Sequence, residues 1–264
     1  VDIVNSIYQE FDITILLIEK RGELINNINK KVKIKYLTLD DVECSNVFQK
    51  IYNKVKRSLI YRHLSKNKNY IKRLYKKVLK EEYDIEIAFL AGAPSHIIKN
   101  SPNKKSKKIG WIHTSVVKDY GSTYKNYSSL TTGYDQIVAV SEESLKIFKN
   151  TFPETSSKLL LIHNYIDIDK IIKKSNEKVD IDFSINKKNI VSIGRVAEEK
   201  GYDRIINIAK NFEDKIDFCI IGDGNLKKEY IQQIKNKQIK NVLFLGLKKN
   251  PYPYLKNADA FLLS

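Results

Sequence analysis

Short apolar runs rich in β-branched residues recur along almost the whole chain. The runs occupy residues 11–18, 32–37, 85–90, 109–113, 136–140, 159–162, 189–193, 216–221, 242–245 and 260–263. Each has the length of a strand, and several are nearly continuous in apolar character. Such continuity predicts strands that are covered on both faces, as in a parallel sheet.

Helical patterns lie between these runs. One stripe of helical spacing consists of Ile205, Ile208, Ala209 and Phe212, and a similar stripe covers residues 226–234. Ser141 precedes two glutamates and predicts the N-cap of another helix. The alternation of strands and helices predicts an α/β fold with doubly wound, Rossmann-like sheets.

A polar, lysine-rich interval over residues 169–188 separates two such series. It predicts a first domain at 1–168, an interdomain linker at 169–188 and a second domain at 189–264. Four strands are few for a doubly wound sheet, so we expect the second domain to be incomplete and to continue past Ser264. The chain contains no methionine and begins within a pattern, so we expect it to be truncated at both ends.

Composition limits the class of protein. The chain has 264 residues, of which 42% are hydrophobic, and a formal net charge of +16. This content of apolar residues argues against intrinsic disorder. No apolar stretch has the length of a membrane span, and the first residues do not resemble a signal peptide. Two widely spaced cysteines, Cys44 and Cys219, predict neither a disulfide framework nor a zinc site, which fits a reducing cytoplasm.

The turn after residues 189–193 contains the clearest candidate for a ligand-binding site in the sequence. Gly194 permits a tight turn, Arg195 leaves the strand end, and Lys200 precedes the start of a helix. Ligands of open α/β sheets bind beyond the carboxyl ends of strands, and a helix N-terminus favours anions. The two cations therefore predict a diphosphate site. Chemistry alone leaves open the alternative that both are solvated surface cations.

Several segments resemble the group 1 glycosyltransferases, which are retaining enzymes of the GT-B architecture. These segments are GRVAEEKG, IIGDGNLKKEY and NVLFLGLKKNPYPYLKNADAFLLS in the second part of the chain, and DQIVAVSEESLKIF and KLLLIHNYID before them. The resemblance implies two Rossmann-like domains in the GT-B arrangement. It also implies that the first domain holds the acceptor and the second holds a nucleotide-sugar donor.

The resemblance further implies roles for single residues. Arg195 and Lys200 stand where the family binds the diphosphate of the donor and stabilises the leaving nucleoside diphosphate. The other donor-binding residues are Gly194, the loop Gly222, Asp223 and Gly224, and the pair Gly246 and Leu247 beside the nucleobase. The two cations would do the electrostatic work of a metal ion, so the resemblance implies neither a metal nor another cofactor.

The histidines differ in context. His113 ends the run at 109–113, where a hydrogen-bonded histidine at a sheet edge and a catalytic one are both compatible with the pattern. The resemblance favours a position near the transferred sugar for His113. His163 lies beside Asn164 in a closing strand and is interpreted as structural, and His63 and His96 have no catalytic context.

Two Asp-x-Asp pairs could bind a divalent cation in the other major glycosyltransferase architecture. They are Asp167 with Asp169 and Asp180 with Asp182. Both fall in or beside the predicted linker, so we interpret them as solvated charges. The family's glycine-rich loop and its glutamate pair have no counterpart in the sequence, so we expect the chain as given to be inactive or nearly so.

Basic residues are concentrated in residues 54–80, and no acidic residue occurs between Glu43 and Glu81. Val55 and Leu59, and later Ile71 and Leu74, suggest amphipathic helices that pack on the sheet or meet a bilayer. We rank contact with an anionic membrane first, unspecific surface charge second and nucleic acid third. No known nucleic-acid-binding motif accompanies the charge.

Together with the basic surface, the family resemblance implies a cytoplasmic glycosyltransferase, peripheral on the inner membrane face. It would transfer a sugar from a nucleotide diphosphate sugar, with retention of configuration, to a lipid-linked or polysaccharide acceptor. A nucleotide-sugar epimerase of the same architecture is the alternative enzyme, and a basic nucleic-acid- or membrane-binding protein without catalysis is the alternative of another class.

Overall fold

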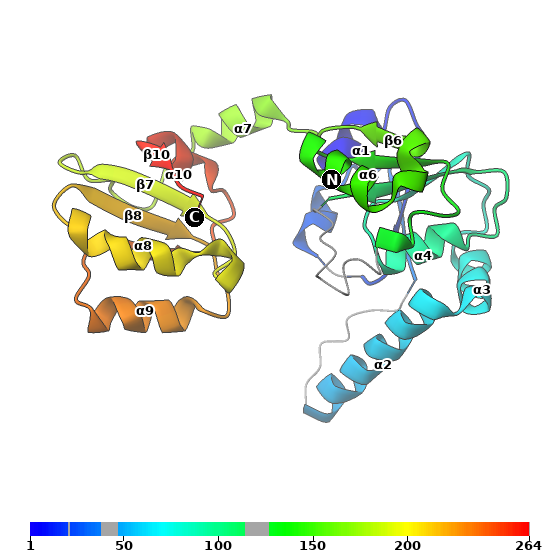
Figure 1. Cartoon of the computed structure of the whole chain (residues 1–264), viewed down its shortest axis with the longest axis horizontal. Coiled ribbons are helices and arrows are strands. Elements are labelled where there is room, and N and C mark those ends of the chain that lie inside the picture. The colour runs from blue at the N-terminus through cyan, green and yellow to red at the C-terminus, as the bar shows by residue number, and fades with distance from the viewer. Residues whose placement is uncertain (21, 38–46, 114–126, 264) are drawn as a thin grey trace. The chain divides into compact units, whose positions relative to one another are not determined.

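The computed structural model describes residues 1–20, 22–37, 47–113 and 127–263. The chain forms two compact units, unit 1 over Val1–Ile166 and unit 2 over Asp167–Ser264 (Figure 1). Each unit has its own parallel sheet and its own apolar core, so each is described separately.

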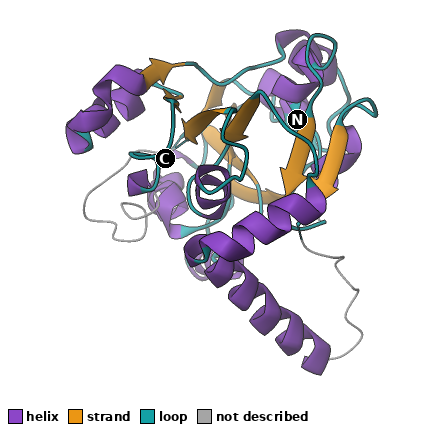
Figure 2. Ribbon diagram, turned by 90° about the vertical axis from the view of Figure 1, so that its right-hand side faces the viewer, coloured by secondary structure: helices purple, strands orange, loops and turns teal. Residues whose placement is uncertain are grey.

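Unit 1 contains a four-stranded parallel sheet in the order β3-β4-β5-β6 and a separate parallel pair. The four strands are β3 (Ile85–Ala88), β4 (Lys107–Ile112), β5 (Gln136–Ala139) and β6 (Leu159–Leu161), and the pair is β1 (Thr14–Leu17) with β2 (Lys33–Tyr36). The strands coincide with the apolar runs of the sequence. The prediction of an α/β fold with parallel sheets is therefore confirmed (Figure 2).

Four of the five helices described in unit 1, all except α1, contribute to two apolar clusters. The five helices are α1 (Asp2–Ile7), α2 (Val47–Lys66), α3 (Lys68–Val78), α4 (Ala93–Lys99) and α6 (Glu142–Thr151), with 3-10 turns at Glu23–Asn27 and Pro153–Lys158. Phe148 of α6 packs on Ile137 and Ile112 of the sheet. As predicted, Ser141 caps α6, since its hydroxyl accepts a hydrogen bond from the Ser144 N–H at 3.1 Å.

Unit 2 is a parallel sheet in the order β10-β7-β8-β9 with helices around it. Its strands are β7 (Lys188–Ile193), β8 (Ile216–Ile221), β9 (Val242–Gly246) and β10 (Ala260–Phe261). Its helices are α7 (Ile168–Ser175), α8 (Tyr202–Ala209), α9 (Lys227–Asn236) and α10 (Tyr252–Asn257), with 3-10 turns at Glu198–Lys200 and Lys210–Phe212.

The two sheets differ in how their faces are covered. Phe218, Cys219, Ile220 and Ile221 of β8 are all buried, so both faces of this strand are covered, as expected. In β3 the burial alternates, because Ala88 is buried while Ile85 and Ile87 are exposed. The expectation of cover on both faces is therefore wrong for β3.

Residues that the sequence analysis treats as a linker pack within unit 2. Helix α7 lies against α10, and Val179, Ile181 and Phe183 contact the buried cluster around Val191. The Asp180 carboxylate accepts a hydrogen bond from the Tyr254 hydroxyl and pairs with Lys248. The Asp180 side chain is 61% exposed, so the charge is solvated as predicted, but its segment packs within unit 2 and is not a free linker.

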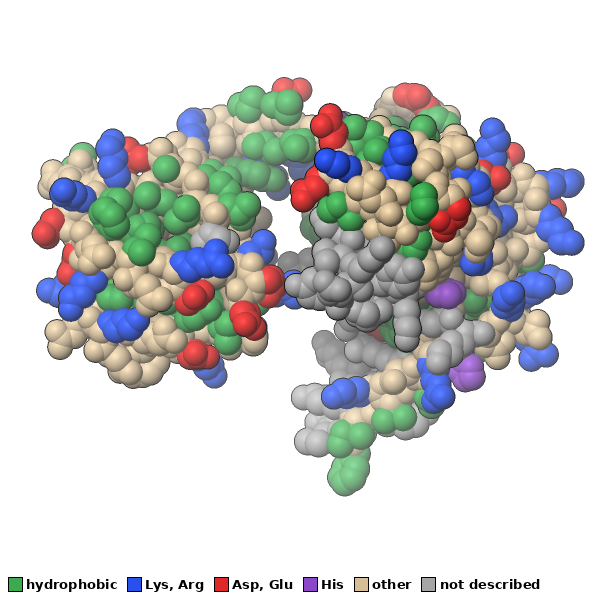
Figure 3. Space-filling model, viewed as in Figure 1, with side chains coloured by type: hydrophobic (Ala, Val, Ile, Leu, Met, Phe, Trp, Pro, Cys, Tyr) green, Lys and Arg blue, Asp and Glu red, His purple; other side chains and the backbone are tan. Residues whose placement is uncertain are grey.

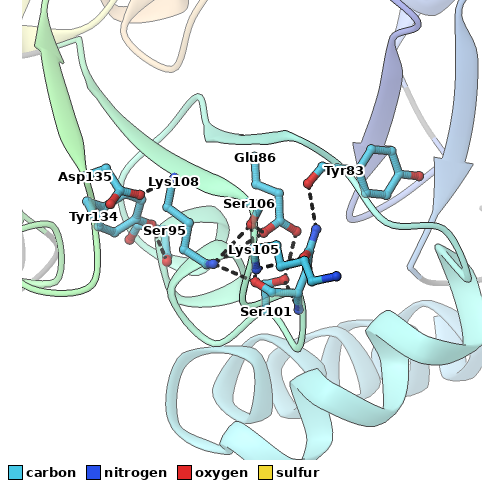
Figure 4. Close-up of polar contacts among 10 residues, drawn as sticks. Tyr83, Glu86, Ser95, Ser101, Lys105, Ser106, Lys108, Tyr134 and Asp135 are labelled. Atoms are coloured by element: carbon cyan, nitrogen blue, oxygen red, sulfur yellow. Dashed lines mark hydrogen bonds and ion pairs between the residues drawn. The ribbon is translucent and has the colours of Figure 1, made fainter.

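A polar cluster joins the amino-terminal ends of β3 and β4 (Figure 4). The Glu86 carboxylate is 4% exposed and accepts hydrogen bonds from the hydroxyls of Ser101, at 2.8 Å, and Ser106. Lys108 Nζ lies 3.6 Å from Glu86 Oε2 and donates to the Asn103 carbonyl at 2.8 Å. These bonds fasten the loop before β4 at the edge of the sheet opposite the one where ligands bind.

Candidate functional site

Three predicted glycine turns lie side by side at the carboxyl edge of the sheet in unit 2. Gly194 follows β7, Gly222 follows β8, and Gly246 ends β9. The Gly194 N–H donates to the Ile221 carbonyl at 3.0 Å, and the Gly222 N–H donates to the Gly246 carbonyl at 2.9 Å. The order β7-β8-β9 therefore gathers residues that are far apart in the sequence into one continuous edge.

Gly222 and Gly224 allow two loops to touch through their backbones. A Cβ at Gly222, whose φ is 152°, would lie 1.9 Å from the Gly194 carbonyl oxygen. A Cβ at Gly224 would lie 2.1 Å from the Val196 carbonyl oxygen. No side chain fits at either distance, so the loop over residues 222–224 rests directly on the turn after β7.

The predicted cations Arg195 and Lys200 flank this turn. Lys200 ends a 3-10 turn, and Gly201 follows in the left-handed conformation with φ 61°, which lets α8 begin at Tyr202. A Cβ at Gly194 would lie 3.4 Å from Lys200 Cε, so the lysine stem lies along the glycine turn. Two of the predicted residues, Gly194 and Lys200, are thereby brought together.

Arg195 extends towards solvent. Its Nη2 atom lies 3.1 Å from Glu199 Oε1, and the arginine side chain is 74% exposed. Exposed ion pairs contribute little to stability, so this pair holds Arg195 only weakly. Arg195 is thus accessible at the carboxyl edge of the sheet.

Lys227 is a third cation at this edge, which the sequence analysis missed. It begins α9, its side chain is 23% exposed, and its Nζ atom lies 3.4 Å from Asp223 Oδ2. Nζ is also 3.6 Å from the position that a Cβ at Gly246 would take. The signal available in the sequence was a lysine four residues after Asp223 at the start of a helix, but a lysine-rich composition hides it.

Asp223 is negatively charged within this group. The Gly224 N–H donates to Asp223 Oδ1 at 2.7 Å, and this bond, followed by the charge of Lys227, lowers the pKa of the carboxyl. Gly246 has φ 74°, and Leu247 after it is exposed. Burial raises the pKa of the Tyr202 phenol beneath the Gly194 turn, and the Ser192 hydroxyl offsets part of that rise. The edge therefore combines backbone turns with Arg195, Lys200 and Lys227 and with the carboxylates of Asp223 and Glu199.

His113 belongs to unit 1 and follows β4 at the carboxyl edge of that sheet. Its ring lies 4.8 Å from Phe89 and 6.5 Å from Trp111, measured between centroids. Its Nε2 atom is buried and has no hydrogen-bond partner within the described part of the chain. His113 therefore belongs to unit 1, whereas Gly194, Arg195, Lys200 and Lys227 belong to unit 2.

The other histidines have structural surroundings. His163 Nδ1 lies 3.2 Å from the Val140 carbonyl oxygen, and the His63 ring is tilted by 36° against the Tyr70 ring with centroids 5.2 Å apart. Half-burial in α4, and then the charge of Lys99, lowers the pKa of His96. Asp167 caps α7, since its Oδ1 atom accepts a hydrogen bond from the Lys170 N–H at 3.0 Å.

Neither a metal cluster nor a membrane span occurs in the described residues. No three His, Cys, Asp or Glu side chains come together there as possible ligands. No helix there has the length and apolar character needed to cross a bilayer. Cys219 is a buried thiol in β8 whose pKa is raised to about 11, chiefly by burial, while Cys44 lies outside the described residues.

Comparison with known proteins adds to this geometry. The model of the family described as glycosyl transferases group 1 matches residues 173–264. An uncharacterized glycosyltransferase of Methanocaldococcus jannaschii is 30% identical over 181 residues, which are 64% of this chain and 44% of the archaeal protein. This chain therefore spans less than half the length of that relative.

A second relative comes from Campylobacter jejuni. It is an N-acetylgalactosamine-N,N'-diacetylbacillosaminyl-diphospho-undecaprenol 4-alpha-N-acetylgalactosaminyltransferase, 29% identical over 128 residues, with 48% of this chain and 34% of the relative covered. The resemblance to group 1 glycosyltransferases that the motifs indicate is thus confirmed.

Solved structures share the fold. Anabaena HepE in complex with UDP and glucose has a TM-score of 0.63 at 13% identity, covering 94% of this chain and 65% of that one. A glycosyltransferase from Rickettsia africae has a TM-score of 0.60 at 14% identity, covering 94% and 63%. The predicted GT-B fold with Rossmann-like units is confirmed by these neighbours and by the parallel sheets.

Proposed function

We propose that this chain forms part of a retaining glycosyltransferase that moves a sugar from a nucleotide diphosphate sugar to a lipid-linked or polysaccharide acceptor. One observation carries the proposal, namely the continuous edge formed by Gly194, Gly222 and Gly246 with Lys200 beside it. This edge lies in the segment that matches the family model. The carboxyl ends of parallel strands are where α/β folds bind nucleotides.

In this proposal, Arg195, Lys200 and Lys227 hold the donor diphosphate. Breaking the bond between sugar and phosphate leaves negative charge on the phosphate, and fixed cations aimed at that charge lower the barrier. The Arg195 guanidinium can donate two hydrogen bonds in a bidentate contact, and each lysine supplies a single positive charge. Asp223 orients Lys227 through their ion pair. These cations take the electrostatic role of a metal ion, so we propose that none is required.

The remaining donor contacts are made through the backbone. The loop over residues 222–224 would face the donor, and the peptide groups of Gly246 and Leu247 would lie against the nucleobase. The presence of UDP in the complex of Anabaena HepE supports a nucleotide as the common ligand of this fold.

Unit 1 is proposed to hold the acceptor, with His113 near the transferred sugar. The name of the Campylobacter relative specifies an acceptor linked to undecaprenol diphosphate, which supports a lipid-linked or polysaccharide acceptor here. With a lipid-linked acceptor, we propose that the enzyme works in the cytoplasm at the inner membrane face.

Calorimetry with UDP tests the donor site. We expect the chain to bind UDP, and Lys200→Ala to weaken binding on the order of tenfold or more, because a charge-assisted contact to the diphosphate is lost. Lys210→Ala, at an exposed site elsewhere in unit 2, is the matched control and leaves affinity unchanged. Equal affinity of the wild type and Lys200→Ala would contradict the proposed site.

Product analysis separates the enzyme classes. The natural full-length protein is incubated with labelled nucleotide sugars and an undecaprenol-diphosphate-linked acceptor. Free nucleotide with a glycosylated acceptor supports transfer, and retention is read from the anomeric configuration of the product. An isomerised nucleotide sugar without transfer would support the epimerase instead.

A further inference from the structure

Two consecutive basic helices of unit 1 present their apolar residues differently. In α3, Ile71 and Tyr75 are buried, and together with Leu79 after the helix they join one apolar core. In α2, Phe48, Ile51, Val55 and Leu59 are between 50 and 86% exposed. We call these four residues the α2 stripe. Four large apolar side chains in water on one helix require a partner surface to explain them.

The α2 stripe faces away from the core of unit 1. Its members are spaced by three, four and four residues, so they lie on one line along the helix. At a rise of about 1.5 Å per residue, the line is roughly 16 Å long. Ile60 and Leu64, which attach α2 to the core, lie on the other side of the helix. Figures 1 and 3 show the helix projecting from unit 1 with apolar side chains along it.

Cations border the α2 stripe. Lys54 and Lys56 are exposed on either side of it, and Arg62 follows at its carboxyl end. Beyond Leu59, a hollow of about 490 Å³ at the elbow between α2 and α3 is lined by Arg62, His63, Asn67, Lys68 and Asn69. The apolar line thus runs between lysines and ends at a hollow whose lining includes a lysine and an arginine.

We propose that α2 docks on an anionic lipid bilayer. The α2 stripe enters the boundary between headgroups and acyl chains, and Lys54, Lys56 and Arg62 contact lipid phosphates. Lysine and arginine carry their charge on long apolar stems, which suits them to this boundary. The hollow at the elbow accepts one phosphate headgroup. Helix α3 contributes cations but no inserted residues, because its stripe is already buried.

Charge distinguishes a bilayer from the other occupants. A second copy of the chain, packed stripe against stripe, would bring Lys54 and Lys56 close to their own counterparts, and the like charges would repel. Nucleic acid would satisfy the cations but would leave the α2 stripe in water. An anionic bilayer satisfies both. This inference extends the proposed function by naming the partner of α2. Loss of vesicle binding would contradict it without affecting UDP binding in unit 2, and the reverse also holds.

Vesicle flotation tests the proposal with the complete chain. Vesicles of phosphatidylcholine are compared with vesicles that also contain phosphatidylglycerol, at low and high salt. We expect binding only to the anionic vesicles and weaker binding at high salt. Phe48→Ser with Ile51→Ser and Val55→Ser is expected to lower the partition coefficient at least tenfold. Binding retained by this variant would overturn the proposal.

Matched variants control for exposed apolar area and for charge. Ile185→Ser with Leu243→Ser removes exposed apolar residues from unit 2 and should leave vesicle binding unchanged. Thermal unfolding of the stripe variant should match the wild type. A large loss of stability, stripe-dependent dimerisation in sedimentation, or binding of oligonucleotides in place of vesicles would each overturn the proposal.

Discussion

Helices α2 and α3 adjoin in sequence, both carry lysines and arginines without an acidic residue, and have different surroundings. The apolar residues of α3 complete a core with Ala93 and Ile97 of α4. In α2 only Ile60 and Leu64 reach that core, while the α2 stripe remains exposed. A helical period therefore identifies an apolar face, but the rest of the fold decides whether that face stabilises the protein or stays available for a partner.

The same substitution in the two helices should give the largest contrast. Ile71→Ala in α3 removes buried side-chain volume and is expected to lower the free energy of unfolding by about 2–5 kcal/mol. Ile51→Ala in α2 should change it by less than about 0.5 kcal/mol, because the side chain is exposed. Urea denaturation of both variants measures the difference. Equal losses would mean that α2 packs as α3 does.

Two glutamates of unit 1 allow the same comparison between a buried and an exposed side chain. Glu86→Gln should destabilise unit 1 by about 1–3 kcal/mol, since Lys108 and the two serine hydroxyls lose a buried, charged acceptor. Glu81→Gln alters a surface pair with Lys35 and should leave the urea midpoint unchanged. A midpoint for Glu86→Gln equal to that of the wild type would show that the cluster in Figure 4 contributes nothing.

Cations of the two helices should differ in vesicle binding. Lys54→Glu with Lys56→Glu in α2 is expected to weaken binding to anionic vesicles on the order of tenfold to a hundredfold. Lys76→Glu with Lys77→Glu in α3 changes the net charge equally and should have a much smaller effect, within about threefold, because no inserted stripe holds these residues at the surface. Equal losses would reduce the membrane contact to unspecific charge.

The smallest expected effect concerns acid stability in unit 2. Lys248, and then the Tyr254 hydroxyl, lowers the pKa of Asp180, so the charged carboxylate stabilises the fold above its ordinary pKa of about 3.9. This contribution is lost as the pH falls through the lower pKa of the folded state. Asp180→Asn should therefore make unfolding less sensitive to pH below about 4, measured by circular dichroism. An unchanged pH profile would contradict the role of this contact.

The strands and much of the donor edge could be predicted from the sequence. The run at 136–140, for example, predicts β5, and Ser141 predicts the start of α6. The placement of Gly194, Gly222 and Gly246 after consecutive strands follows from the rule that parallel strands end at one edge. The approach of Lys227 to Asp223 and the contact of Asp180 with Tyr254 could not be predicted, since the former is obscured by abundant lysines and the latter joins residues far apart in the chain.

By itself, the sequence determined the order of strands and helices, the glycine turns and the family resemblance, because these depend on side-chain period and local backbone conformation. The tertiary structure alone decided which apolar faces are buried, that residues 167–187 pack in unit 2, and that Glu86 is held among hydroxyls. The physical reason is that burial is a property of contacts between distant segments. Two basic helices that adjoin in the sequence can therefore end in different environments.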